Sequence, residues 1–277
     1  MKQKTKVDDS SKMEFKIKEG RFMVAGTSAD NKIVEASGPQ GASGSNQSAG
    51  TSGPQGASGS NQTASTSGPQ DASGDAPCHK QASGDAACAF SLPAGRLAFI
   101  LSDGMGKGMK AAAESKAVVT ELKRLLRKDV APARAIKLVN KKLITSKEMF
   151  ATVDLTVIDK QKGTASFYKM GAASSFLLRN GQVKKIEQAA LPIGIVKRVK
   201  ASQTKIKLRS KDLLIIVSDG ITEADRRDLE TRWLQEYLTQ NADIEPTEMA
   251  GEIAKIAQSK YKTRERDDIT VIVIRIE

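Results

Sequence analysis

The sequence predicts an α+β fold in which β-sheets are covered by helices. Segments with strand character follow one another along the chain, and the predicted helices come in pairs between groups of strands. The regular alternation of strand and helix that a doubly wound parallel sheet requires is missing. Of the 277 residues, roughly 230 lie outside a low-complexity repeat, which is enough for one sizeable core.

The first half of the chain contains three predicted strands and two predicted helices. The strands are residues 21–24, Lys32–Val34 and the fully apolar run 97–101. Residues 109–128 are predicted to form a helix, because apolar side chains recur on one face at helical spacing. A second helix is predicted to begin at Pro132, since proline suits the first position of a helix.

Strand patterns dominate the second half. The predicted strands are residues 150–158, 164–169, Ser175–Arg179, Gln182–Ile186, 204–208, Leu213–Val217 and Ile269–Ile276. The dipeptide Asn180-Gly181 predicts a tight hairpin turn between two of them. Two more helices are predicted at residues 228–238 and 247–260, the latter with Pro246 at its entrance.

Residues 36–81 differ from the rest in composition and are predicted to be a disordered insertion. The segment SGPQGASGSNQSAGT begins at Ser37, and related copies begin at Ser52 and Ser67, so the repeat has a period of 15 residues. The repeat has almost no apolar side chain to bury and therefore cannot offset the entropy lost on ordering. We expect residues 1–35 to begin one domain and residues 82–277 to complete it.

Composition limits the classes of partner. The chain has 44 Lys and Arg against 32 Asp and Glu, a formal net charge of +12, which suits acidic partners. Only 4% of residues are aromatic, which argues against a base-stacking surface, so we expect no nucleic-acid partner. A nucleic-acid binder is the rival that the charge alone would support.

No segment of the sequence is long and apolar enough to cross a bilayer, and no secretory signal opens it, so we expect no membrane contact by this chain. Two cysteines are too few for a disulfide framework. The expected location is therefore the reducing cytoplasm, with membrane attachment only if a spanning region is missing from this chain.

Acidic residues stand at the ends of the most apolar strands. The runs 97–101 and Leu213–Val217 both continue into the tripeptide Ser-Asp-Gly, and the strand Ile269–Ile276 is entered through two aspartates. Carboxylates that converge at strand ends repel one another unless a cation lies between them. The candidate carboxylates are Asp85, Asp103, Asp219 and the pair Asp267 and Asp268.

An all-oxygen ligand set favours a hard ion, Mg²⁺ or Mn²⁺, over zinc, because the chain has one histidine and two cysteines. Glycine directly after aspartate lets the backbone carbonyl approach an ion. The alternative is that Ser-Asp-Gly is only a turn, closed by hydrogen bonds of the aspartate side chain. Two copies after matched apolar runs favour the metal site.

These motifs together resemble the phosphatase domain of the stage II sporulation protein E family, which belongs to the metal-dependent (protein phosphatase 2C-like, PPM) serine/threonine phosphatases. The order and spacing of the motifs are more specific than any one of them. The resemblance extends from about Gly20 to the end, apart from the repeat. The matching segments are residues 83–85, 102–108, 114–115, 150–155, 169–172, 191–195, 218–221 and 267–271.

The resemblance implies an α-β-β-α sandwich of two antiparallel sheets flanked by helices, with two Mn²⁺ or Mg²⁺ ions at one edge. Residues 1–35 and 82–277 would form the phosphatase domain. Matched motif by motif, Asp103 would bridge both ions and the carbonyl of Gly104 would complete one of them. Asp219 and Asp267 would bind the other ion. Asp85 would support the site. Asp85 and Asp103 are the candidate catalytic residues.

Two choices within this set stay open. Ser-Gly-Asp occurs twice, and the spacing in the family, 18 positions to Asp103, fits Asp85, whereas Asp75 lies 28 positions away. At the end of the chain the family motif places the ligand first, at Asp267, which leaves Asp268 as the alternative.

The function that the resemblance implies is hydrolysis of phosphoserine on a small phosphorylated anti-anti-sigma factor, which would activate a sporulation sigma factor. A homodimer is compatible with this role. The alternative is a catalytically inactive domain of the same fold that binds a partner. The presence of all four expected carboxylates argues against this alternative.

Overall fold

The computed structural model describes residues 83–106, 108–146, 149–228, 230–261 and 267–276, together with the backbone of three short segments near the N-terminus. These segments are the strands β1 (Ile17–Lys18), β2 (Phe22–Ala25) and β3 (Lys32–Val34). The predicted insertion at residues 36–81 lies outside the described residues.

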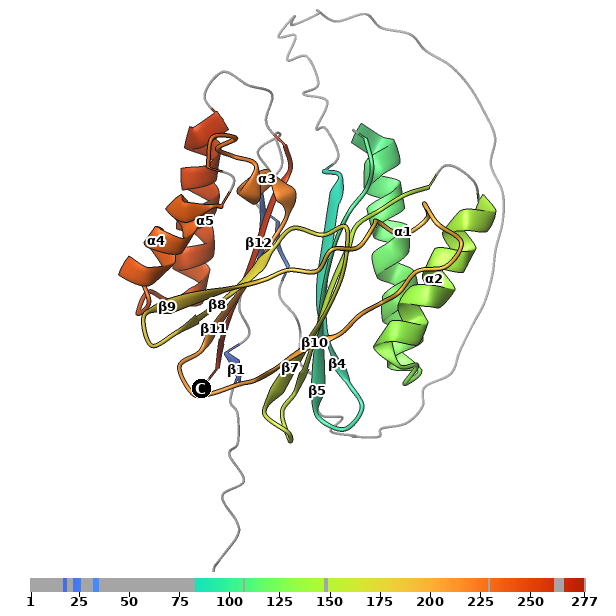
Figure 1. Ribbon diagram of the computed structural model, residues 1–277, viewed down its shortest axis with the longest axis horizontal. Helices are drawn as coiled ribbons and strands as arrows, with labels where there is room; N and C mark the ends of the chain where they lie inside the picture. Colours follow the sequence, from blue (N-terminus) through green and yellow to red (C-terminus); the bar gives the residue numbers. More distant parts are fainter. Residues whose placement is uncertain are drawn as a thin grey trace, which may run out of the picture. The chain divides into compact units, whose positions relative to one another are not determined.

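In the part of the chain that the structure describes, twelve strands form two sheets, and every neighbouring pair is antiparallel. The first sheet has the order β10-β7-β6-β5-β4. Its strands are β4 (Asp85–Leu92), β5 (Arg96–Asp103), β6 (Val153–Asp159), β7 (Thr164–Met170) and β10 (Thr204–Lys207). Because β4, β5, β6 and β7 follow one another in space, this sheet is largely a meander (Figure 1).

The second sheet has the order β3-β2-β12-β11-β8-β9, with β1 also paired to β12. Besides the three N-terminal strands it contains β8 (Ser175–Arg179), β9 (Gln182–Ile186), β11 (Leu213–Val217) and β12 (Ile269–Ile276). The predicted hairpin turn between β8 and β9 is confirmed: Asn180 and Gly181 both have positive φ, 50° and 73°.

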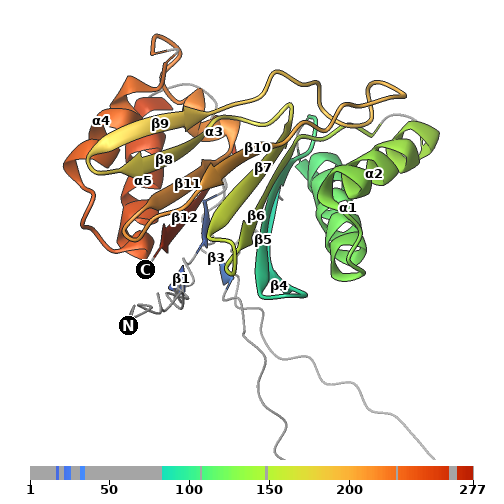
Figure 2. The ribbon, with the colours of Figure 1, turned by 60° about the horizontal axis from the view of Figure 1, so that its bottom comes forward.

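Helices cover the outer face of each sheet. The helices α1 (Gly108–Arg127) and α2 (Pro132–Ser146) pack on the five-stranded sheet, and α4 (Arg232–Gln240) and α5 (Pro246–Tyr261) pack on the other (Figures 1 and 2). The two sheets meet through a third apolar layer that includes Phe99, Phe167 and Ile272. The predicted α-β-β-α sandwich is therefore confirmed. None of the helices in the described part of the chain combines the length and apolarity that crossing a bilayer demands.

The uninterrupted apolar runs of the sequence are explained by burial on both faces. In β11, Leu213, Ile215 and Val217 pack toward the helices, whereas Leu214 and Ile216 pack toward the other sheet. A strand with one solvent-exposed face would alternate polar and apolar residues. Each such side chain contributes about 1.5–3 kcal/mol when fully buried, so these strands hold their acidic ends on a rigid frame.

Three details of the fold differ from the sequence prediction. The strand β4 was not predicted, because its residues Asp-Ala-Ala-Cys-Ala-Phe-Ser-Leu include small side chains of low strand propensity. The helix α4 begins at Arg232 instead of residue 228, and Asp228 accepts hydrogen bonds from the N–H groups of Thr231 (3.0 Å) and Trp233 (2.9 Å) ahead of it and in its first turn. A single unpredicted helical turn, α3 (Asp219–Thr222), follows β11.

Candidate metal centre

Asp85 lies at the point where the two sheets meet. It begins β4 directly opposite Asp103, the last residue of β5. Its side chain is 7% exposed, and one carboxylate oxygen accepts a hydrogen bond from the hydroxyl of Thr270 on β12 (2.7 Å). The other oxygen, Oδ1, has no hydrogen-bond partner among the described residues. A buried carboxylate oxygen without a donor is a candidate to face a cation or water.

The backbone fixes Asp103 in place. Its N–H donates to the hydroxyl of Thr152 (2.9 Å), and its carbonyl accepts from the N–H of Thr152 (2.8 Å). The next residue, Gly104, donates its N–H to the carbonyl of Gly84 (3.1 Å). The Asp103 side chain therefore projects from a rigid strand end, beside the chain that carries Asp85.

The second Ser-Asp-Gly is tied to the start of β12. Ser218 donates its hydroxyl to the carbonyl of Asp268 (3.2 Å) and accepts from the N–H of Thr270 (2.9 Å). A Cβ on Gly220 would lie 2.0 Å from the carbonyl oxygen of Asp268, so only glycine allows this approach. These contacts place Asp219, the first residue of α3, beside the aspartate pair.

The aspartate pair itself is arranged asymmetrically. Asp268 accepts a short hydrogen bond from the N–H of Gly84 in the first sheet, so one of its oxygens is committed to a structural contact. Asp267 accepts from the N–H of Asp268 (2.9 Å). Both carboxylates act on Asp103.

The negative charges of neighbouring candidate carboxylates act on Asp103. Burial raises the pKa of Asp103 to about 7, and the negative charges of Asp219, Asp267 and Asp268 add to this shift. Carboxylates from three distant parts of the sequence thus act on Asp103 or belong to it. Their repulsion favours protonation, or a cation between them.

The pKa values of two further carboxylates, Asp219 and Asp85, are also raised. Burial, and then the charges of Asp267 and Glu223, raise the pKa of Asp219 to about 6. The pKa of Asp85 lies well above its ordinary value because of burial, and the charge of Asp103 contributes in the same direction. Asp103 and Asp219 are therefore poised to exchange a proton for a metal ion near neutral pH.

The donor set fits divalent hard ions. The side chains supply oxygen only, Oδ1 of Asp85 lacks a partner, and the carboxylates repel one another. Within the described residues, however, no three acidic, histidine or cysteine side chains are already grouped closely enough to hold an ion. Binding would therefore draw the side chains of Asp103, Asp219 and the Asp267–Asp268 pair together, which flexible aspartate rotamers allow.

The metal-free protein is expected to lose stability as the pH rises from about 4 to about 7. In the unfolded chain these carboxyls have a pKa near 3.9. In the folded chain the raised pKa values keep Asp103 and Asp219 protonated to about 7 and about 6, so folding binds protons in this range and a higher pH opposes it. Melting temperatures measured in chelator at about pH 5 and about pH 7.5 test this.

Mn²⁺ is expected to raise the melting temperature by several degrees more at about pH 7.5 than at about pH 5, because protons compete with the ion for the same carboxylates. A Mn²⁺ effect of equal size at both pH values would contradict this assignment.

A buried ion pair next to these carboxylates was given no role by the sequence. Lys169 on β7 donates to Asp154 on β6 and to the carbonyl of Ala173, and the hydroxyl of Ser175 donates to the same oxygen of Asp154 (2.9 Å). Lys169 and Asp154 have side chains that are 0% and 1% exposed. The signal available in the sequence is a lone charge within each of two otherwise strand-like runs.

Asp154 also faces the acidic centre. It lines a small internal cavity of about 10 Å³ together with Asp103 and Asp219, and its second oxygen has no hydrogen-bond partner among the described residues. The Lys169–Asp154 pair therefore connects the loop that contains Ala173 to the wall of the acidic centre.

Gly104 lies directly beneath the first turn of α1. A Cβ at this position would be 2.0 Å from the carbonyl oxygen of Ala111. Gly104→Ala is therefore expected to displace the start of α1 and to lower the free energy of unfolding by about 1–3 kcal/mol, measured by urea denaturation. Gly84→Ala is the matched control, because the nearest atom to its Cβ would be a side-chain oxygen of Asp268 at 3.2 Å, which would need to shift by only a few tenths of an ångström. Equal losses in the two variants would refute the backbone clash.

Comparison with known proteins agrees with this arrangement. The family model described as Stage II sporulation protein E (SpoIIE) matches residues 93–277. Stage II sporulation protein E of Bacillus subtilis (strain 168) is 33% identical over 198 residues, which cover 70% of this chain and 24% of that protein. The chain thus spans about a quarter of the length of this relative.

Solved structures extend the likeness to three dimensions. The PP2C phosphatase domain of SpoIIE from Bacillus subtilis, solved with a fragment of its regulatory domain, superposes with a TM-score of 0.64 at 32% identity, over 70% of this chain and 58% of that chain. The serine/threonine phosphatase Stp1 from Staphylococcus aureus has a TM-score of 0.60 at 19% identity, over 73% and 92% of the two chains, which shows the shared fold. The chain therefore belongs to the stage II sporulation protein E family and contains its phosphatase domain of the protein phosphatase 2C type.

Proposed function

We propose that this chain is a metal-dependent protein-serine/threonine phosphatase that hydrolyses phosphoserine on a small phosphorylated anti-anti-sigma factor in the cytoplasm, and that it thereby activates a sporulation sigma factor. The observation that carries this proposal is the convergence of carboxylates from β4, β5, β11 and β12 at one edge of the two sheets. The family to which the chain belongs supports the same reading.

The residues that would hold two Mn²⁺ or Mg²⁺ ions are Asp103 between them, the carbonyl of Gly104, and Asp219 with Asp267, while Asp85 supports the site. Ions bound in this way activate water for attack on phosphorus and neutralise charge on the phosphoryl oxygens. An oxygen-only ligand set of this kind suits these ions.

The chain's own groups prepare the site for this chemistry. Thr152 holds the backbone of Asp103, and Thr270 orients the carboxylate of Asp85. The buried Lys169–Asp154 pair closes the wall behind them. Backbone positions that are fixed in this way would keep the charged groups in place once ions are bound, and preorganised charge of this kind accelerates a reaction.

The test is hydrolysis of p-nitrophenyl phosphate and of a phosphorylated anti-anti-sigma factor, each with Mn²⁺ and with chelator. We expect turnover of both substrates with Mn²⁺ and loss of turnover with chelator. A folded sample that hydrolyses neither substrate would refute the enzyme assignment. Titration calorimetry that shows no Mn²⁺ binding at millimolar concentration would instead support an inactive partner-binding domain of the same fold. Light scattering of the same sample measures whether the chain forms the proposed homodimer.

A further inference from the structure

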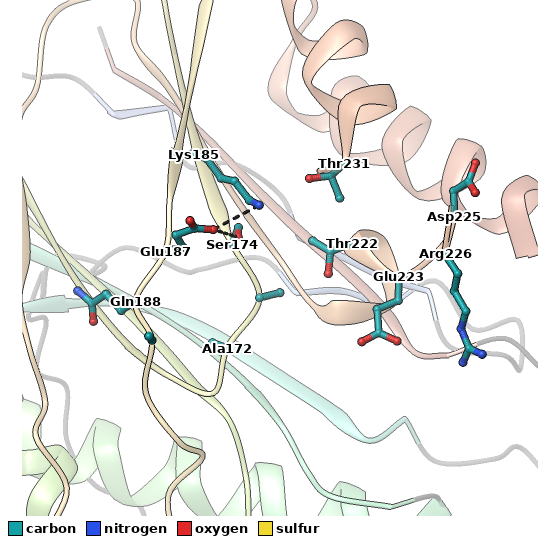
Figure 3. Close-up of a pocket in the computed structure, with 12 residues that line it drawn as sticks. Ala172, Ser174, Lys185, Glu187, Gln188, Thr222, Glu223, Asp225, Arg226 and Thr231 are labelled. Carbon is teal, nitrogen blue, oxygen red and sulfur yellow. Dashed lines mark hydrogen bonds and ion pairs between the residues drawn. The ribbon is translucent and has the colours of Figure 1, made fainter. Parts of the chain in front are cut away.

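An open pocket of about 710 Å³ adjoins the acidic centre (Figure 3). One wall comes from the loop before β8 and from the end of β9, and includes Ser174 and Lys185. The opposite wall comes from the end of α3 and the loop after it, and includes Glu223 and Arg226. Among the residues drawn in Figure 3, no interaction joins the two walls; Lys185 also pairs with Glu230 (3.8 Å), which is not drawn.

The pocket is continuous with the lining of the acidic centre. Ala172 and Ala173 line both this pocket and the small cavity that contains Asp103 and Asp219. On the other wall, Glu223 donates its backbone N–H to the carbonyl of Asp219 (2.7 Å), so the walls of the pocket start at the proposed metal ligands. Groups attached to a phosphoryl group at the acidic centre would therefore extend into this pocket.

We propose that this pocket binds the polypeptide segment that flanks the phosphoserine of a protein substrate, and that Arg226 selects an acidic residue in that segment. The inference rests on the proposed phosphatase function and adds to it a recognition surface and a charge preference.

The charges of the pocket single out Arg226. Lys185 already pairs with Glu187 (3.3 Å) and Glu230 (3.8 Å). Asp225 pairs with Lys260 and Arg227, both at 3.7 Å. Arg226 is exposed and has no ion pair or hydrogen bond to any residue that the structure describes. An unpaired guanidinium on the wall of a pocket is available to a carboxylate on a ligand.

Glu223 places a negative charge on the pocket wall nearer the acidic centre. It lies four residues after Asp219, whose carbonyl accepts a hydrogen bond from its backbone N–H (2.7 Å). Along this wall the charge thus changes from negative at Glu223 to positive at Arg226. A substrate segment complementary to this wall would have a neutral residue next to the phosphoserine and an acidic residue farther along. Electrostatic complementarity of this kind gives specificity.

The form of the wall suits an extended polypeptide. The strand β9 is the last strand of its sheet, so within the described residues its outer edge pairs with no further strand. Exposed sheet edges bind extended peptides through main-chain hydrogen bonds, with side-chain pockets that supply specificity.

The experiment compares two short phosphoserine peptides that are identical except for one pair of residues. Each peptide has alanines beside the phosphoserine, followed on both sides by Glu in the first peptide and by Lys in the second. The measured quantity is the ratio of kcat/KM for the two peptides with Mn²⁺, using the full chain. Wild type is expected to prefer the Glu peptide, and Arg226→Glu is expected to shift the ratio toward the Lys peptide by about three- to tenfold.

Arg209→Glu is the matched control, because it reverses the same charge on an exposed residue before β11, at the opposite end of that strand from Asp219. We expect it to leave the peptide ratio at the wild-type value. A wild-type ratio near one, or an Arg226→Glu variant that loses activity equally on both peptides, would overturn the proposal. An equal shift in the Arg209→Glu variant would show a general charge effect and would also overturn it.

A binding assay separates this inference from the proposed function. The same two peptides are made with a non-hydrolysable phosphonate, and their affinities are measured by fluorescence anisotropy with Mn²⁺. If no peptide is turned over but wild type binds the Glu peptide more tightly and Arg226→Glu loses this preference, the recognition surface stands and the phosphatase function falls. If peptides are turned over and neither assay shows a charge preference, the function stands and the recognition surface falls.

Discussion

Asp103→Asn is expected to lower Mn²⁺-dependent turnover of p-nitrophenyl phosphate by about a thousandfold or more, equivalent to about 4 kcal/mol in the activation barrier. The substitution keeps the shape of the side chain and removes its charge. Asp103 interacts with Asp219, Asp267 and Asp268, so its loss affects the whole ligand set. Steady-state rates and calorimetric Mn²⁺ affinity are the measurements.

The same variant should gain stability in chelator. Because burial and neighbouring charges raise the pKa of Asp103 to about 7, ionisation of this residue opposes folding at about pH 7.5, and asparagine removes that penalty. A higher melting temperature together with lost turnover would separate a chemical role from misfolding. The matched control is Asp75→Asn, which should keep wild-type turnover. The reverse pattern, with Asp75 essential and Asp103 dispensable, would overturn the proposed ligand set.

Lys169→Met is expected to lower the free energy of unfolding by about 3–5 kcal/mol, because it leaves the buried carboxylate of Asp154 without its cation. Urea denaturation measures the loss. The control Lys205→Met removes an exposed lysine from β10 and should change stability by less than about 0.5 kcal/mol.

The double variant Lys169→Met/Asp154→Leu distinguishes a structural role from a functional one. Replacing both members of a buried pair by apolar residues is often neutral for stability, so most of the loss should be recovered. Turnover by the double variant should be below the wild-type value, because Asp154 lines the cavity shared with Asp103 and Asp219, and Lys169 holds the carbonyl of Ala173. Recovery of both stability and turnover would mean that the pair serves the fold alone.

The sequence predicted the helices and strands whose residue pattern follows directly from which of their faces are buried. The strand β11 is apolar throughout because both of its faces are buried, and α1 shows helical spacing because one face packs on a sheet. The acidic residues at the ends of such strands could be recognised for the same reason. That they converge required the resemblance, because nothing local states that β5 and β11 end at the same edge.

Other features depend on register and tertiary contact. Asp154 and Lys169 are direct cross-strand partners in the β6–β7 hairpin, so their pairing follows once the turn between the strands is fixed. The strand β4 is held by its neighbour β5 and by α1 rather than by its own propensity. The pocket wall that carries Arg226 belongs to a loop, whose course no periodic pattern predicts.

The hydrogen bonds that join Gly84 to Asp268 and Asp85 to Thr270 connect positions that are 184 and 185 residues apart. Synthesis proceeds from the N-terminus, at about 5–20 residues per second, so β4 and β5 leave the ribosome long before their partners on β12 exist. A nascent polypeptide that has not yet reached Asp267 lacks the partners of Gly84 and Asp85 on and just before β12. The proposed ligand set would therefore be incomplete until β12 has been synthesised.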